Sequence, residues 1–218
     1  MVALAALPRR DEQSREHLDN AARHARPLVL AGERVLTVSG PLGALLPAGA
    51  VQRGTVVAID GEPGAGATAV AFQLAAAATA AGEWAAAVEL DASLGGLAAG
   101  EAGIELERFA VVRRVPPARW AAVVAALLDG ISVVLAEVPA FARIGDTRRL
   151  LARARERGAV LVAMGPWPAE ATLRLHAGGS VWRGLDAGAG LLAGRDQRVQ
   201  VGGHGVAARE HVALVEAG

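Results

Sequence analysis

A glycine-rich segment with phosphate-binding spacing lies near the first third of the 218-residue chain. Gly61, Gly66 and Thr68 occupy the positions of a P-loop, a turn whose backbone N–H groups cradle phosphates, and Gly64 adds backbone freedom between them. In such a loop a lysine contacts the β- and γ-phosphates and the next hydroxyl binds Mg²⁺. The lysine position holds Ala67, so the loop keeps an anion-binding shape but lacks the cation.

The residues on either side of this segment predict how it is held. An apolar strand at 55–60 enters the loop and an alanine-rich helix at 69–81 leaves it. Further apolar strands, alternating with helices, are expected at 84–90, 109–112, 131–136 and 159–164. This alternation predicts an α/β fold with a mostly parallel sheet and helices on both faces. Short runs from residue 180 onward predict antiparallel strands at the C-terminal edge of the sheet.

Composition narrows the classes of function. The 22 basic residues, all arginine, equal the 22 acidic residues, so the chain lacks the basic balance of most nucleic-acid binders. The absence of cysteine excludes disulfides and cysteine-based zinc sites, and the five histidines show no metal-binding spacing, so no metal site is expected. No stretch reads as a secretory signal or a membrane span, so we expect a cytoplasmic protein with no membrane segment.

The N-terminal segment has a pattern of its own. Residues 11–25 predict a helix with one narrow apolar stripe, formed by Leu18, Ala21, Ala22 and Ala25. Burying so small a stripe on the chain's own core contributes only a few kcal/mol, at about 25 cal/mol/Å². Small residues do allow close approach to another protein. We therefore divide the chain into an N-terminal helical arm and linker at 1–44 and a core domain at 45–218, and expect the arm to dock on a partner; a frayed terminus is the alternative.

The order of the segments resembles the core of the RecA recombinase. The residues from Leu46 to Gly61 resemble the entry to that core, because a leucine-proline turn precedes the P-loop strand. Residues 73–82 resemble the helix after the loop, and residues 103–109 resemble the step before the third strand. The similarity covers about residues 45–164 and implies a RecA-like P-loop core.

The departures from RecA fall on residues with chemical roles. Ala67 replaces the P-loop lysine, and Ser93 occupies the position of the catalytic glutamate. Glu137 ends the fourth strand where the Walker B aspartate belongs, and Met164 and Gly165 stand where RecA has its nucleotide-sensing glutamine. The loop after Met164, at 165–180, is expected to be shorter than the DNA-binding loop of RecA.

Phosphoryl transfer depends on the groups that are missing, so the resemblance implies a protein without ATPase activity and without catalytic residues. The candidate cofactor-binding residues form a degenerate P-loop: Gly61, Gly64, Gly66, Ala67, Thr68 and Glu137. No cofactor is expected, and residual binding of ATP and Mg²⁺ is the alternative. A tight turn kept for the fold, with a solvated carboxylate at Glu137, would explain the same residues without a ligand.

A degenerate RecA-like chain is similar to accessory proteins of the bacterial mutagenic translesion-synthesis cassette, the ImuA type, and to the cell-division inhibitor SulA. The first resemblance implies a non-catalytic adaptor in DNA-damage-induced mutagenesis, part of the SOS response and DNA repair. Its expected partners are a Y-family-like polymerase homologue and a DnaE-type error-prone polymerase, with RecA as a further candidate. The alternatives are a DNA-dependent RecA-type ATPase that uses residues in trans and a SulA-like inhibitor of cell division.

Arginine clusters are the candidate DNA contacts: Arg113, Arg114, Arg148 and Arg149. Because the net charge is zero, we expect weak and steeply salt-dependent DNA binding or none. A docking face for an acidic partner and a merely solvated face are the alternatives for these clusters.

Overall fold

The computed structural model describes residues 34–184, 194–203 and 206–216, all within one compact unit that begins at Arg34. The predicted helix at 11–25 lies outside the described residues, together with its stripe of Leu18, Ala21, Ala22 and Ala25. Within the described part of the chain, no helix is both long enough and apolar enough to cross a bilayer.

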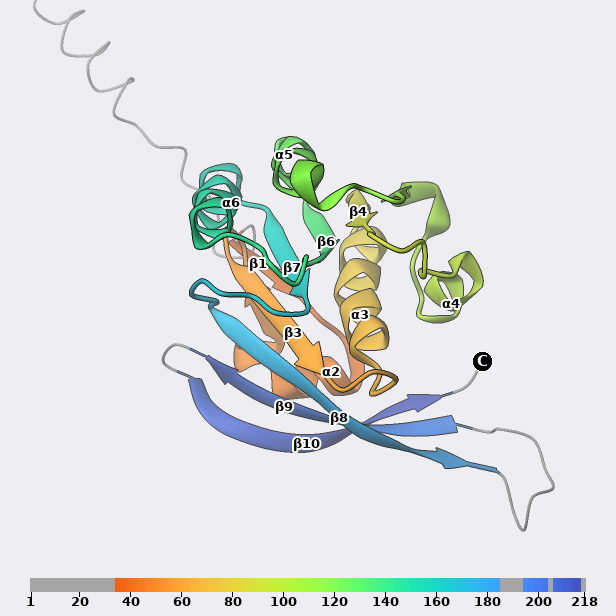
Figure 1. The fold of residues 1–218 in the computed structure, drawn as a ribbon. Helices are drawn as coiled ribbons and strands as arrows, with labels where there is room; N and C mark the ends of the chain where they lie inside the picture. The colour runs from red at the N-terminus through yellow and green to blue at the C-terminus, as the bar shows by residue number, and fades with distance from the viewer. Residues whose placement is uncertain (1–33, 185–193, 204–205, 217–218) are drawn as a thin grey trace, which may run out of the picture. The chain divides into compact units, whose positions relative to one another are not determined.

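An eight-stranded sheet forms the centre of this unit, in the order β10-β9-β8-β3-β7-β6-β4-β5 (Figure 1). The strands are β3 (Val56–Gly61), β4 (Ala85–Val88), β5 (Phe109–Val112), β6 (Val133–Glu137), β7 (Val160–Met164), β8 (Leu173–Arg183), β9 (Gly194–Gly203) and β10 (Val206–Glu216). Pairing is parallel from β8 to β5, whereas β9 pairs antiparallel with both β8 and β10. The predicted α/β class is confirmed, with its mostly parallel sheet and antiparallel C-terminal edge strands.

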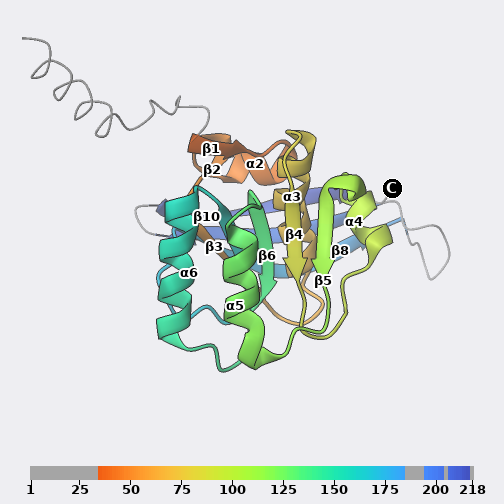
Figure 2. The same ribbon diagram turned by 90° about the horizontal axis from the view of Figure 1, so that it is seen from above.

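Helices cover both faces of the sheet (Figure 2). On one face lie α2 (Gly40–Leu45), α3 (Ala67–Ala80) and α4 (Gly96–Glu101), and on the other lie α5 (Pro117–Leu128) and α6 (Ile144–Arg157). Along β7 the side chains alternate between the two layers, Val160 and Val162 facing one and Leu161 and Ala163 the other. Burial on both faces explains why these strands are apolar without interruption.

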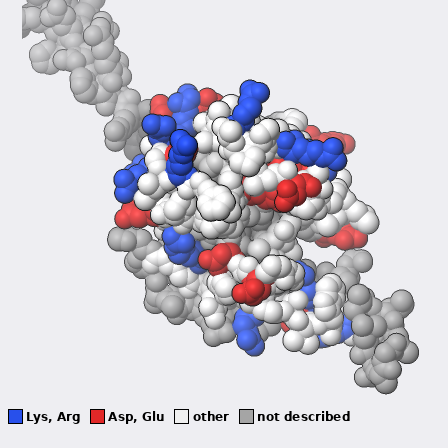
Figure 3. Space-filling model, viewed as in Figure 1, with Lys and Arg blue, Asp and Glu red and all other residues white. Residues whose placement is uncertain are grey.

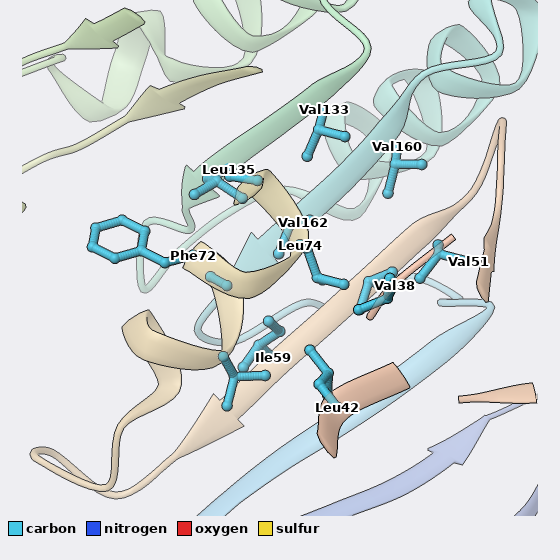
Figure 4. Close-up of a cluster of buried hydrophobic side chains, with 14 of the residues drawn as sticks. Val38, Leu42, Val51, Ile59, Phe72, Leu74, Val133, Leu135, Val160 and Val162 are labelled. Atoms are coloured by element: carbon cyan, nitrogen blue, oxygen red, sulfur yellow. The ribbon is translucent and has the colours of Figure 1, made fainter. Parts of the chain in front are cut away.

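The layer beneath α3 is aliphatic (Figure 4). Leu74 from α3 and Leu42 from α2 are fully buried in the same cluster as Ile59 of β3 and Leu135 of β6. Among the described residues of this layer, Phe72 and Phe109 form an aromatic pair, edge to face at 6.3 Å between ring centroids. Branched aliphatic side chains therefore do most of the packing, as the low aromatic content predicts.

A small antiparallel pair, β1 (Val35–Thr37) and β2 (Ala50–Gln52), precedes the main sheet. Between these strands lie α2 and the 3₁₀ turn η2 (Pro47–Gly49), and a second such turn, η3 (Leu106–Arg108), precedes β5. The helix α2 lies within the segment at 1–44 that the sequence analysis describes as an arm and linker. Because Leu36 and Leu42 are buried in the core, residues 34–44 belong to the compact unit and not to a separate arm.

The segment after β7 differs from the prediction. Residues 165–180 were expected to form a loop, but β8 begins at Leu173 and pairs parallel with β3. Its buried residues, Leu173, Leu175 and Ala177, alternate with exposed Arg174 and His176. That period of two is a strand signal, and the glycines that follow it obscured it.

Candidate functional site

The glycine-rich loop (residues 61–68) joins β3 to α3 as a P-loop would. Gly66 is the N-cap of α3 and has a φ of 93°, in the left-handed region that side chains other than glycine rarely adopt. No side chain caps the helix, and its first turn contains no acidic residue. The first N–H groups of α3 therefore remain available to an anion.

A pocket of about 1030 Å³ opens beside this loop. The loop, including Ala67 and Thr68, lines one side, and α3 and α4 add apolar side chains such as Phe72 and Ala98. Trp182 at the end of β8 and Arg195 on β9 also line it. A pocket of this size with one polar and one apolar side can hold a nucleotide-sized ligand.

Arg195 is a site residue that the sequence did not reveal. Its guanidinium lies 5.3 Å from the centre of the Trp182 ring, a cation–π contact. Its Nη2 atom lies 3.0 Å from the point where a Cβ on Gly66 would be. The strand β9 therefore places a positive charge against the loop that lacks a lysine at position 67. Only the folded sheet brings these distant residues together, so no local motif could have indicated the contact.

Gln197 braces the same loop from β9. Its side chain is fully buried, and Nε2 donates hydrogen bonds to the carbonyl oxygens of Ala65, at 2.5 Å, and Gly178, at 2.9 Å. A Cβ on Gly66 would meet Oε1 of Gln197 at 2.1 Å. Packing alone thus requires glycine at position 66, whether or not the pocket holds a ligand.

Glu137, the candidate Walker B carboxylate, is bound by its own chain. Its Oε2 atom accepts a hydrogen bond from the N–H of Leu90 at 2.5 Å, and its Oε1 atom accepts one from Oγ of Ser93 at 3.0 Å. The structure therefore brings together Glu137, which stands at the position of the Walker B aspartate, and Ser93, which stands where RecA has its catalytic glutamate. They contact each other, and neither lines the pocket beside the glycine-rich loop.

An ion pair between a buried glutamate and a half-exposed arginine lies close to Ser93 and Glu137 in the chain after β4. Glu89 is fully buried, its Oε2 atom accepts a hydrogen bond from the N–H of Leu94 at 2.8 Å, and its Oε1 atom lies 3.1 Å from Nη1 of Arg113. Arg113 also donates to the carbonyl oxygen of Leu94. Arg113 therefore has a structural role within the described chain, whereas its neighbour Arg114 is exposed.

The other candidate DNA contacts lie on α6. Arg148 and Arg149 are both exposed, and Arg149 forms a weak contact of 3.4 Å with Asp146. Towards the end of the helix, Arg153 and Arg157 contact Asp129 at 2.6 and 3.2 Å. The hydrogen bond from Arg153, helped by the attraction of both arginines, lowers the pKa of Asp129 below its ordinary value, and the same bond raises the pKa of Arg153.

One further polar pair lies beside the loop. Nδ1 of His176 on β8 lies 2.6 Å from Oδ1 of Asp60, near the end of β3. Both side chains are about half exposed, so the pair ties the ends of two neighbouring strands without a buried charge. Among the described residues, no three histidine, aspartate or glutamate side chains are grouped so as to hold a metal ion.

These features define an α/β protein with a glycine-rich loop and a pocket at the carboxyl ends of parallel strands. The model of the MT3502 N-terminal domain family matches residues 44–169, and the chain belongs to this family. The matched segment includes the glycine-rich loop, Ser93 and Glu137, and it ends before β8 and β9, which carry Trp182, Arg195 and Gln197. No curated protein shows significant sequence similarity to the chain.

Proposed function

We propose that this chain is a RecA-like adaptor that does not hydrolyse nucleotide and acts in DNA-damage-induced mutagenesis. In this proposal it links a Y-family-like polymerase homologue to a DnaE-type error-prone polymerase in the cytoplasm. The RecA-like assignment rests on the sequence similarity of residues 45–164, and the parallel sheet with a glycine-rich loop between β3 and α3 is compatible with it.

The observation that carries the non-catalytic part is the state of Glu137. Phosphoryl transfer needs a cation at the phosphates, a carboxylate for Mg²⁺ and a group that orients water. Here position 67 is alanine, both oxygens of Glu137 accept hydrogen bonds from the chain, and Ser93 is one of the donors. Loss of one positioned electrostatic group typically reduces a rate by about 10²–10³-fold, so the combined loss leaves no useful turnover.

A RecA-type ATPase that takes residues in trans is the second candidate, and the open pocket favours it. Arg195 could then supply the positive charge that Ala67 does not, while the groups that hold Mg²⁺ and water would come from a neighbouring subunit. This alternative predicts turnover only when the protein assembles on DNA.

ATP turnover measured on the purified chain, with and without single-stranded DNA, separates the two candidates. We expect no turnover above background from the wild type. Ala67→Lys should bind nucleotide more tightly and still not turn it over, because Glu137 remains bound to Leu90 and Ser93. DNA-stimulated turnover that Thr68→Ala abolishes would contradict the adaptor proposal. Thr68 is exposed, so this variant tests the site without disturbing the core.

The partner assignment needs its own measurement. Affinity purification of the tagged chain from DNA-damaged cells should recover the two polymerase components. Recovery of cell-division proteins in their place would support the SulA-like alternative and exclude the polymerase adaptor.

A further inference from the structure

We propose that the N-terminal ends of α5 and α6 form a docking surface for an acidic protein segment that carries an apolar anchor side chain. The surface, called the α5–α6 patch below, consists of Arg114, Arg119, Phe141, Arg143, Ile144 and Arg148. It deepens the adaptor function and rests on it, since it names where one partner binds and what chemistry that partner presents.

The apolar centre of the patch is the loop between β6 and α6. The side chain of Phe141 is 96% exposed, the highest value among the large hydrophobic side chains described, and Ile144, the first residue of α6, is 49% exposed. Exposing a full aromatic ring to water is unfavourable, and exposed aromatic side chains are typical anchors of protein interfaces. The ring therefore marks a point at which an apolar partner group can bind.

Four arginines lie near the same ends of α5 and α6 as this apolar centre. Arg114 and Arg119 lie before and within the first turn of α5, and Arg143 and Arg148 lie at the start of α6. All four are exposed, and none forms a hydrogen bond or an ion pair through its side chain within the described residues. Figure 2 shows α5 and α6 side by side, and Figure 3 shows arginine side chains bordering the surface over these helices, with uncharged atoms between them.

The position of these arginines argues against a purely structural role. A helix N-terminus carries partial positive charge, so arginine there is electrostatically unfavourable. The first turn of α5 has no acidic residue, and neither helix has a side-chain cap. At the opposite ends of the same helices, Arg153 and Arg157 are paired with Asp129. Near the starts of the helices, Arg119, Arg143 and Arg148 have no side-chain partner among the described residues, although Asp146 lies in the first turn of α6 and contacts Arg149.

An acidic peptide fits these observations better than a nucleic acid. Single-stranded DNA is usually bound by several stacking rings along a continuous basic groove. Of the six residues of the patch, Phe141 alone has an aromatic ring. Exposed Asp91 follows β4, which lies between β5 and β6 in the sheet, so an acidic group lies at the same end of the sheet as the starts of α5 and α6. A short peptide with a few carboxylates and one apolar side chain can bind the patch without approaching Asp91. A nucleic acid strand that runs along this end of the sheet would bring its phosphates close to that carboxylate.

The test uses the full-length chain and a fluorescent glutamate-rich peptide that carries one phenylalanine-leucine pair, with binding followed by anisotropy. The same peptide with glutamine in place of glutamate tests the charge, and oligothymidine of equal charge tests nucleic acid. Phe141→Ala removes the exposed ring at the apolar centre of the patch, and Arg148→Gln removes the charge of one of its four arginines. Matched controls are Leu97→Ala, a large hydrophobic residue that is 78% exposed on α4, and Arg155→Gln, an exposed arginine further along α6.

We expect the acidic peptide to bind the wild type, and to bind less at about 0.2 M than at about 0.05 M salt. Phe141→Ala and Arg148→Gln should each weaken binding at least fivefold, about the loss that defines an interface residue of consequence, while both controls bind as the wild type does. No binding, equal loss in the controls, or tighter binding of oligothymidine would overturn the proposal. The peptide assay contains no nucleotide, so a failure to bind peptide would not change the conclusion that Ala67 and Glu137 do not support ATP hydrolysis. ATP turnover by the purified chain would refute the adaptor proposal but would not change the measured peptide affinity.

Discussion

The carboxyl ends of β3 and β6 lie at the same end of the parallel sheet, yet the polar groups at the two positions differ in whether they are bonded to the rest of the chain. At the end of β3 the glycine-rich loop leaves the start of α3 uncapped and open to a pocket of about 1030 Å³. At the end of β6 the carboxylate of Glu137 accepts hydrogen bonds from Leu90 and Ser93, and buried Glu89, the residue after β4, is paired with Arg113. The end of β3 therefore keeps the shape of an anion-binding site. At the end of β6 the acidic side chains hold neighbouring loops together.

This difference shows how a site can lose its chemistry and keep its architecture. A carboxylate that binds Mg²⁺ presents oxygen lone pairs to the ion, whereas at Glu137 one lone pair on each oxygen is used to hold the chain after β4. The loop at β3 is subject to another constraint, because Gln197 packs against Gly66. Its glycine is required by packing even where no phosphate binds.

The largest effect is expected at Gly66. Gly66→Ala adds a methyl group against the buried Gln197 amide and forces a left-handed residue, so it should destabilise the fold by about 2–5 kcal/mol. Gly64→Ala is the matched control, because its φ is also positive but no atom lies within 4 Å of the added carbon, and about 1–2 kcal/mol is expected. Chemical denaturation measures both. Equal losses would mean that the loop is not braced by β9.

An intermediate effect is expected at Arg113. Arg113→Gln leaves Glu89 fully buried without its cation and should reduce stability by about 2–3 kcal/mol, less than for a fully buried pair because Arg113 is half exposed. Arg114→Gln changes a neighbouring arginine that has no side-chain partner among the described residues and should alter the unfolding free energy by less than about 0.5 kcal/mol. If the two variants were equally stable, the ion pair of Glu89 and Arg113 would not be structural, and the contrast with β3 would fail.

The smallest effect is expected at Ser93. Ser93→Ala removes one exposed hydrogen bond to Glu137 and should reduce stability by about 0.5 kcal/mol. ATP turnover should stay at background, since Leu90 still holds the other oxygen of Glu137. A gain of turnover in this variant would show that the serine had been masking a working carboxylate.

The fold could be predicted from the sequence because the strands between β3 and β7 are local apolar runs separated by helical segments. The boundary of β8 could not, since its alternating residues lead into Gly178 and Gly179, which obscure a strand pattern. In the site, the glycine spacing and the alanine at position 67 were visible directly. The roles of Arg195, Gln197 and Glu89 depend on contacts between distant strands, and no spacing in the chain encodes them.

The brace on the glycine-rich loop also sets an order of events during synthesis. Gln197 follows Ala65 by 132 residues, so a ribosome completes β3, the loop and α3 long before their support exists. Domains generally fold as units during synthesis, and pairing of residues that are distant in sequence is slower than pairing of local ones. The nascent protein therefore passes through a stage in which the parallel strands can pair while the edge of β8 is still uncovered. The pocket acquires its final wall only when β9 pairs with β8 and brings Arg195 next to Trp182.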